Sequence, residues 1–128
     1  IEQNGLKAMS EKLGKGIICF SPLAQGMLSD RYLNGIPEDS RVRTDGRFLQ
    51  ESRLSDEVLD KIRALNEIAQ GRGQTLAEMA LAWLLKEEVI TSVLAGASKP
   101  SQILDNIKAV ENTSFTKDEI ETIDRISK

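Results

Sequence analysis

Residues 17–28 of the chain are Ile17-Ile18-Cys19-Phe20-Ser21-Pro22-Leu23-Ala24-Gln25-Gly26-Met27-Leu28. The four apolar residues at 17–20 predict a short buried strand, because unbroken apolar runs of this length are typical of parallel sheets covered on both faces. Pro22 ends the strand, since proline cannot donate a hydrogen bond to a ladder. Pro22 and Gly26 then give the backbone a tight path, along which a ligand can approach closely. A plain strand-to-loop turn explains the pattern equally well.

A second strand is predicted at Ile90 to Ala95, and it is followed by the start of a helix at Pro100. Backbone N–H groups are free at a helix N-terminus, and Ser98 and Lys99 lie beside them, so this segment is typical of an anion site. An ordinary helix cap is the alternative.

Three polar residues of the same helix, Gln102, Asp105 and Asn106, lie three or four positions apart. This spacing places them on one helical face, where they can hydrogen-bond a base or a ribose. A solvated face with no ligand explains the same spacing.

The remaining elements are predicted from helical periodicity and caps. Leu6, Met9 and Leu13 mark a first helix, closed by glycines. Ser55 is the expected N-cap of a second helix, and capping boxes at Thr75–Glu78 and Thr116–Glu119 open two more. The predicted inward residues are Val58, Ile62, Leu65, Ile68 and Ala69, then Leu76, Met79, Ala80, Trp83 and Leu84, and finally Ile120, Ile123 and Ile126. Residues 30–53 are predicted to be a long polar loop, either functional or disordered.

Strands separated by helices indicate parallel pairing and an α/β fold. Only two strands are available, and a two-stranded parallel sheet leaves most of its apolar surface uncovered. We therefore expect further strands, preferably from an N-terminal part of the same protein and otherwise from other chains. The opening Ile1-Glu2-Gln3-Asn4 is likewise typical of the interior of a longer chain.

Composition excludes several classes of function. The 128 residues carry a net charge of −3, and Lys and Arg do not cluster, so we expect no nucleic-acid partner. No apolar run approaches the roughly 18 residues that a membrane span needs. The chain has no His, which removes His-based catalysis and His-ligated metals. Its one cysteine, Cys19, is predicted to be a buried structural thiol.

The two segments that follow the predicted strands give stronger evidence for a shared anion site than either segment gives alone. Each directly follows one of the two predicted strands. In a (β/α)8 barrel, the loops after the last two strands form a common phosphate site. If these strands are the seventh and eighth, both loops meet at one anion.

Both loops resemble the NADP-binding segments of aldo-keto reductases. The resemblance rests on Ser21-Pro22-Leu23-Ala24-Gln25-Gly26-Met27-Leu28 and on the spacing Gly96-Ala97-Ser98, Gln102, Asn106, and it continues through the flanking segments 32–37 and 79–84. It is nearest to the bacterial glyceraldehyde-phosphate-reducing branch, and next to the potassium-channel β-subunits. It implies the C-terminal part of a (β/α)8 barrel, with residues 1–128 forming one portion of a single domain.

The resemblance also implies roles for individual residues, with NADPH as the cofactor. Phe20, Ser21, Pro22, Leu23, Ala24, Gln25 and Gly26 would line the pyrophosphate and the nicotinamide. Arg31, Asp39 and Arg41 would belong to a loop over the cofactor. Gly96, Ser98 and Lys99 would hold the 2′-phosphate, and Gln102, Asp105 and Asn106 the adenine and ribose. Lys99 stands where many members have Arg, and a point charge replaces bidentate binding there. Asp105 stands where Glu is common, and its reach is shorter.

The family's catalytic Tyr, Lys, Asp and His lie on earlier strands, so no catalytic residue is assigned here. The one tyrosine, Tyr32, lies in the predicted cofactor loop. The resemblance implies a cytoplasmic reductase of small aldehydes of the glyceraldehyde 3-phosphate or methylglyoxal type, in which hydride passes to a carbonyl carbon. A non-catalytic subunit that senses NADPH is the alternative. Self-association into a homo-oligomer, including a half-barrel built with copies of this chain, is also open.

Overall fold

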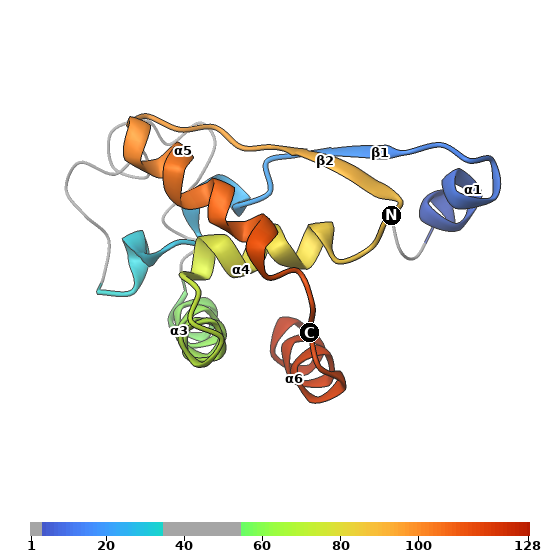
Figure 1. Ribbon diagram of the computed structural model, residues 1–128. Coiled ribbons are helices and arrows are strands. Elements are labelled where there is room, and N and C mark those ends of the chain that lie inside the picture. The colour runs from blue at the N-terminus through green and yellow to red at the C-terminus, as the bar shows by residue number, and fades with distance from the viewer. Residues whose placement is uncertain (1–3, 35–54) are drawn as a thin grey trace.

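The computed structural model of the protein describes residues 4–34 and 55–128. Figure 1 shows a two-stranded sheet with helices packed on one side of it. The elements in chain order are α1 (Leu6–Lys12), β1 (Ile17–Phe20), η1 (Ala24–Gly26), η2 (Asp30–Tyr32), α3 (Asp56–Gly71), α4 (Leu76–Leu85), β2 (Ile90–Leu94), α5 (Pro100–Ile107), η4 (Lys108–Glu111) and α6 (Lys117–Ser127).

The two strands pair in parallel, as the alternation of strands and helices predicts. Phe20 lies opposite Leu94 at the carboxyl ends, so the loops that follow the strands leave from the same edge. Ile17 lies opposite Ile90 and Ile18 opposite Ser92, so one residue of β2, Thr91, is left over as a bulge.

The prediction that residues 17–20 form a fully buried strand is wrong. Ile18 is 64% and Phe20 81% exposed, while Ile17 and Cys19 are half-buried. The strand alternates because α4 covers only one face of the sheet and no described element covers the other (Figure 1). Cys19 lies on the covered side, but it is only half-buried rather than enclosed.

Helix α4 lies at the centre of the described structure. It packs against β2, α3, α5 and η4, and α3 in turn packs against α6. Leu81 and Ala82, which the predicted inward face leaves out, are fully buried, because neighbours surround α4 on nearly all sides. Trp83, predicted as a core residue, is half-buried and packs against the edge of the core. The buried cluster consists of Ile62, Ala69, Leu76, Met79 and Ile123.

The predicted caps are confirmed. The side chain of Ser55 accepts a hydrogen bond from the N–H of Val58 at the start of α3. Complete capping boxes open α4 at Thr75–Glu78 and α6 at Thr116–Glu119. Glu78 is buried, and its carboxylate accepts from the N–H of Thr75 at 2.8 Å. These helix starts are local features, so the sequence places them accurately.

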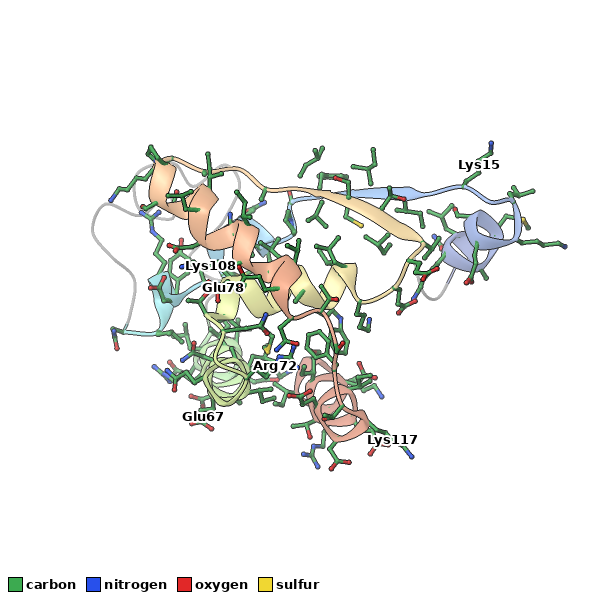
Figure 2. All side chains as sticks on the ribbon, in the orientation of Figure 1. Lys15, Glu67, Arg72, Glu78, Lys108 and Lys117 are labelled. Atoms are coloured by element: carbon green, nitrogen blue, oxygen red, sulfur yellow. The ribbon has the colours of Figure 1, made fainter. Side chains whose placement is uncertain are left out.

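Arg72 joins two distant parts of the chain. Its side chain is only 5% exposed, and it lies between α3 and α6 (Figure 2). The guanidinium donates to Glu119 Oε2 at 2.8 Å, to Gln74 Oε1 at 2.9 Å, and to the carbonyls of Ser114 at 2.9 Å and Asn112 at 3.3 Å. Gln74 Nε2 adds a hydrogen bond of 3.1 Å to the Asn112 carbonyl. The turn between α3 and α4 thereby holds the segment that leads into α6.

The same guanidinium is the first of four side chains that contact one another in a row through cation–π and edge-to-face aromatic contacts. It lies 3.8 Å from the centre of the Phe115 ring, and that ring meets Trp83 edge to face with centroids 5.1 Å apart. Lys86 Nζ lies 4.1 Å from the centre of the Trp83 ring. Cations are attracted to the faces of aromatic rings, and the two rings attract each other edge to face. These contacts therefore reinforce the packing of α4 against the segment that leads into α6.

We expect Arg72→Ala to lower the free energy of unfolding by about 3 kcal/mol, because it removes a hydrogen-bond donor from the Glu119 carboxylate, from the Gln74 amide oxygen and from the carbonyls of Asn112 and Ser114. Urea denaturation followed by circular dichroism measures this. Arg63→Ala is the control: it removes an exposed ion pair to Asp60, and its cost should stay below about 1 kcal/mol. Equal losses in the two variants would contradict the central role of Arg72.

Gly16 should not tolerate a side chain. An added Cβ would overlap Thr91 Oγ1 and lie 3.0 Å from Thr91 Cβ, at the bulge of β2. We expect Gly16→Ala to cost about 1–3 kcal/mol of stability through overpacking. Gly71→Ala is the matched control, because nothing lies within 4 Å of its added Cβ. Thermal unfolding of both variants checks the prediction, and similar melting temperatures would refute it.

Candidate functional site at the carboxyl edge of the sheet

The two predicted binding loops leave the sheet side by side. Phe20 and Leu94 end the paired strands, so the segments 21–26 and 95–99 begin at one edge. Ligand sites in parallel α/β structures lie at this edge, because the loops there converge. The parallel pairing therefore brings together the two segments that the sequence singles out.

The loop after β1 has an unusual backbone. Ser21, Ala24 and Gln25 have positive φ angles of 54°, 47° and 61°, and Gly26 follows with 95°. Residues other than glycine adopt this left-handed region at an energetic cost, and such strained positions cluster at functional sites. Figure 1 shows this segment turning away from the sheet toward η2. Ser21 and Gln25 are exposed, while Pro22, Leu23 and Ala24 are half-buried.

Ser29 holds this loop in place, and Tyr32 lies beside it. Ser29 Oγ donates to the Gly26 carbonyl at 2.6 Å and caps η2 by accepting from the Arg31 N–H. Tyr32 is buried, and an added Cβ on Gly26 would lie 3.8 Å from its ring. A serine directly before Asp30 is a recognisable N-cap signal, but the burial of Tyr32 has no local signal.

The loop after β2 presents several donors to one oxygen atom. Gln102 Oε1 accepts from the N–H of Ser98 at 2.8 Å, from the N–H of Lys99 at 3.2 Å and from the Ser98 hydroxyl at 3.2 Å. The backbone groups expected to be free are thus capped by a side chain of their own helix. That cap is exposed, as are Gly96, Ser98 and Lys99.

Asp105 and Asn106 have different surroundings from Gln102. Asp105 accepts from Lys108 Nζ at 3.0 Å, and this carboxylate raises the pKa of Lys108 above its ordinary value. Asn106 is half-buried and lines a groove of about 230 Å³ between α4, β2 and α5. The structure places the three residues on α5, but it does not bring their side chains to a common point.

The loop residues expected to fold over a cofactor are only partly described. Arg31 is exposed in η2. Asp39 and Arg41 lie outside the described residues. Within residues 4–34 and 55–128, no group of three or more His, Cys, Asp or Glu residues is arranged to hold a metal ion. None of the helices in those ranges is long and apolar enough to cross a membrane.

Comparison with known proteins identifies the family of the chain. The model of the aldo/keto reductase family matches residues 1–128. L-glyceraldehyde 3-phosphate reductase from Escherichia coli K12 is 45% identical over 128 residues. A putative voltage-gated potassium channel subunit beta from Schizosaccharomyces pombe is 38% identical over 112 residues, which are 85% of this chain and 33% of that protein. The chain belongs to the aldo/keto reductase family.

A solved structure is similar over the same length. The holo form of an aldo-keto reductase from Bacillus halodurans superposes with a TM-score of 0.67 at 26% identity, covering 98% of this chain and 38% of that one. The match to the Escherichia coli K12 enzyme likewise covers 98% of this chain and 37% of the relative. The chain therefore spans little more than a third of the proteins that it matches.

The Gln102 cap should be measurable in solution. Gln102→Ala removes a cap of about 1 kcal/mol, so the amide hydrogens of Ser98 and Lys99 should exchange about fivefold faster. Ser101→Ala, an exposed change on the same helix, is the control and should leave both rates unchanged. Hydrogen exchange followed by NMR distinguishes them. Unchanged exchange in Gln102→Ala would show that the side chain does not cap the helix in solution.

Proposed function

We propose that this chain is the NADP(H)-binding part of an oxidoreductase that reduces small aldehydes by hydride transfer. The observation that carries the proposal is the set of three donors that converge on Gln102 Oε1. An acceptor oxygen is accommodated there, and a phosphate oxygen would accept hydrogen bonds from the same three donors. Family membership supplies the identity of the ligand class.

The residues of the second loop fit a phosphate monoester. The N–H groups of Ser98 and Lys99 and the Ser98 hydroxyl are neutral donors at a helix N-terminus, where the helix dipole favours an anion. The Lys99 ammonium adds a positive charge, and in the described part of the chain it forms no ion pair. These residues would bind the 2′-phosphate of the cofactor, and that contact would favour NADPH over NADH. Gly96 lets the backbone approach closely.

The first loop would hold the rest of the cofactor. Phe20 is 81% exposed at the carboxyl end of β1 and offers an aromatic face beside the backbone of residues 21–26. Because Ser29 holds the carbonyl of Gly26, the polar groups of that strained backbone are oriented before a ligand arrives. NADPH would supply the hydride when bound, and these residues would position it. Arg31, Asp39 and Arg41 are proposed to close over it.

The adenine end is proposed to rest on α5. Asn106 and Asp105 would hydrogen-bond the base and the ribose, and Gln102 would join them on leaving its cap. Asp105 would have to share its carboxylate with Lys108. These assignments follow the family resemblance. The same resemblance is the basis for proposing an eight-stranded barrel whose last two strands, with their helices, lie in residues 1–128.

Glyceraldehyde 3-phosphate or a methylglyoxal-like aldehyde is the proposed substrate, because the relatives at 45–47% identity are L-glyceraldehyde 3-phosphate reductases. No residue of this chain is assigned to proton transfer, so turnover would need side chains from other strands.

A regulatory subunit that binds NADPH without turnover is the second candidate, favoured by the similarity to a channel β-subunit. Aldehyde-dependent oxidation of NADPH by the full-length protein would distinguish the two.

The proposed cofactor site is tested by titrating the chain with NADPH and NADH and following amide chemical shifts by NMR. We expect shifts at Ser98, Lys99 and Gly26, with tighter binding of NADPH. Lys99→Ala should weaken NADPH binding about tenfold, because one charge-assisted contact is worth about 1.4 kcal/mol, and should leave NADH binding nearly unchanged. Lys117→Ala, on the exposed face of α6, is the control. Equal effects on both cofactors would remove Lys99 from the 2′-phosphate site.

A further inference from the structure

The turn formed by residues 24–26 has a backbone conformation that its sequence does not favour. Ala24 and Gln25 have φ angles of 47° and 61°, whereas Gly26, at 95°, is a residue for which a positive φ costs little. The N–H of Gly26 donates to the Leu23 carbonyl at 2.9 Å. That bond closes the turn on itself, so it does not fix the turn against the rest of the protein.

The hydroxyl of Ser29 connects this turn to the next element of the chain. Its Oγ donates to the Gly26 carbonyl at 2.6 Å, which is at the short end of the range for a hydroxyl donor. The same oxygen accepts from the Arg31 N–H at 3.4 Å, where Ser29 caps η2. A serine hydroxyl can donate once and accept as well, so both bonds form together. The bond to Gly26 is the stronger one, because 3.4 Å exceeds the usual distance for an N–H donor.

The residues around Ser29 are anchored in the protein. Tyr32 of η2 is only 2% exposed. Met27 and Leu33, which lie on either side of Ser29 in the chain, pack against the buried cluster of α3, α4 and α6. Ser29 is half-buried between them, whereas Gln25 is exposed. The hydroxyl therefore has a defined position, and its hydrogen bond fixes the adjoining turn relative to the core.

We propose that Ser29 is a positioning residue for the cofactor: its hydroxyl holds the 24–26 turn against η2, so that the turn and Arg31 are placed together before a dinucleotide binds. The inference rests on the proposed function, because the cofactor is the ligand that both segments would contact. Without the hydroxyl, Ala24 and Gln25 would relax toward negative φ. Restoring the turn would then reduce the free energy of binding. Ser29 itself needs no contact with the cofactor.

A simple helix cap is the alternative role of Ser29. Serine is a common N-cap, and a cap needs only an acceptor oxygen. Ser29→Asp keeps an acceptor for the Arg31 N–H, but an ionised carboxylate cannot donate to the Gly26 carbonyl. Ser29→Thr keeps the donor and the acceptor. These two variants therefore separate the bond to the turn from the cap of η2.

The first measurement is hydrogen exchange of the full-length protein without added cofactor, followed by mass spectrometry of peptides that cover residues 22–28 and 30–33. We expect Ser29→Ala to speed exchange in both segments about fivefold, the factor by which one neutral hydrogen bond changes an equilibrium. Ser29→Asp should speed exchange in residues 22–28 alone, and Ser29→Thr should match the wild type.

Ser127→Ala is the matched control for these exchange rates. It removes an equivalent bond from a serine hydroxyl to a backbone carbonyl, that of Ile123 on α6, at 2.8 Å. Because this bond lies away from the turn, the control should leave exchange in both segments unchanged. Circular dichroism of each variant confirms that the helices stay folded.

The second measurement is the affinity for NADPH, determined by fluorescence titration of the same proteins. We expect Ser29→Ala to weaken binding about fivefold, in proportion to the loosened turn. Ser29→Thr should restore the wild-type affinity, because it returns the hydroxyl. Ser127→Ala should bind NADPH as the wild type does.

Three results would overturn the proposal. The first is unchanged exchange of residues 22–28 in Ser29→Ala. The second is wild-type exchange of that segment in Ser29→Asp, which would make Ser29 a cap of η2 only. The third is faster exchange in Ser29→Ala with unchanged NADPH affinity, since the turn then need not be held for binding. A wild-type protein that binds no NADPH would count against the proposed function, while the exchange rates would still show whether Ser29 holds the turn.

Discussion

The packing of the described structure depends on the buried guanidinium of Arg72. A buried charge is unfavourable unless it is fully paired, and Arg72 is paired with a carboxylate, a side-chain amide and two backbone carbonyls, over the face of Phe115. Burial alone would raise the pKa of Glu119, but the hydrogen bonds from Thr116 and Arg72 prevail and hold that pKa below its ordinary value. The carboxylate therefore stays charged beside the guanidinium.

The position of the candidate site follows from this packing. The Arg72 network holds the start of α6 against the turn between α3 and α4, and Ile123 of α6 completes the core beneath α4. Helix α4 then supports β2 and α5, whose connecting loop carries Ser98 and Lys99. The polar donors of the site are exposed, but a buried helix positions the elements that carry them. A binding loop keeps a defined geometry when its two ends are held in this way.

Local signals in the sequence predict much of the fold. Helix caps depend on residues three positions apart, so Ser55, Thr75 and Thr116 are placed correctly. The second strand is one residue shorter than predicted, since it ends at Leu94 rather than Ala95. The alternation of strands and helices also predicts the parallel pairing, because a strand that returns through a helix runs in the same direction.

Other features depend on partners that a local pattern does not contain. The Arg72 hydrogen bonds span 40 to 47 residues to the α6 segment, so nothing near Arg72 indicates them. The burial of Leu81 arises because α4 has neighbours on nearly all sides. The sequence predicts that Gln102 contacts a ligand, and that prediction stays open; in the structure its oxygen caps its own helix. A polar residue in the first turn can do either, and only the folded geometry distinguishes them.

The sequence by itself determined the family, the two strands, the helix starts and the two loops that carry the candidate site. Each of these can be recognised from a short run of neighbouring residues. Tertiary structure alone decided which apolar side chains are buried, which half of the chain forms its own core, and which donors converge on one oxygen. These depend on distances between residues far apart in the chain. Such distances are set by the packing of whole helices against one another and against the sheet.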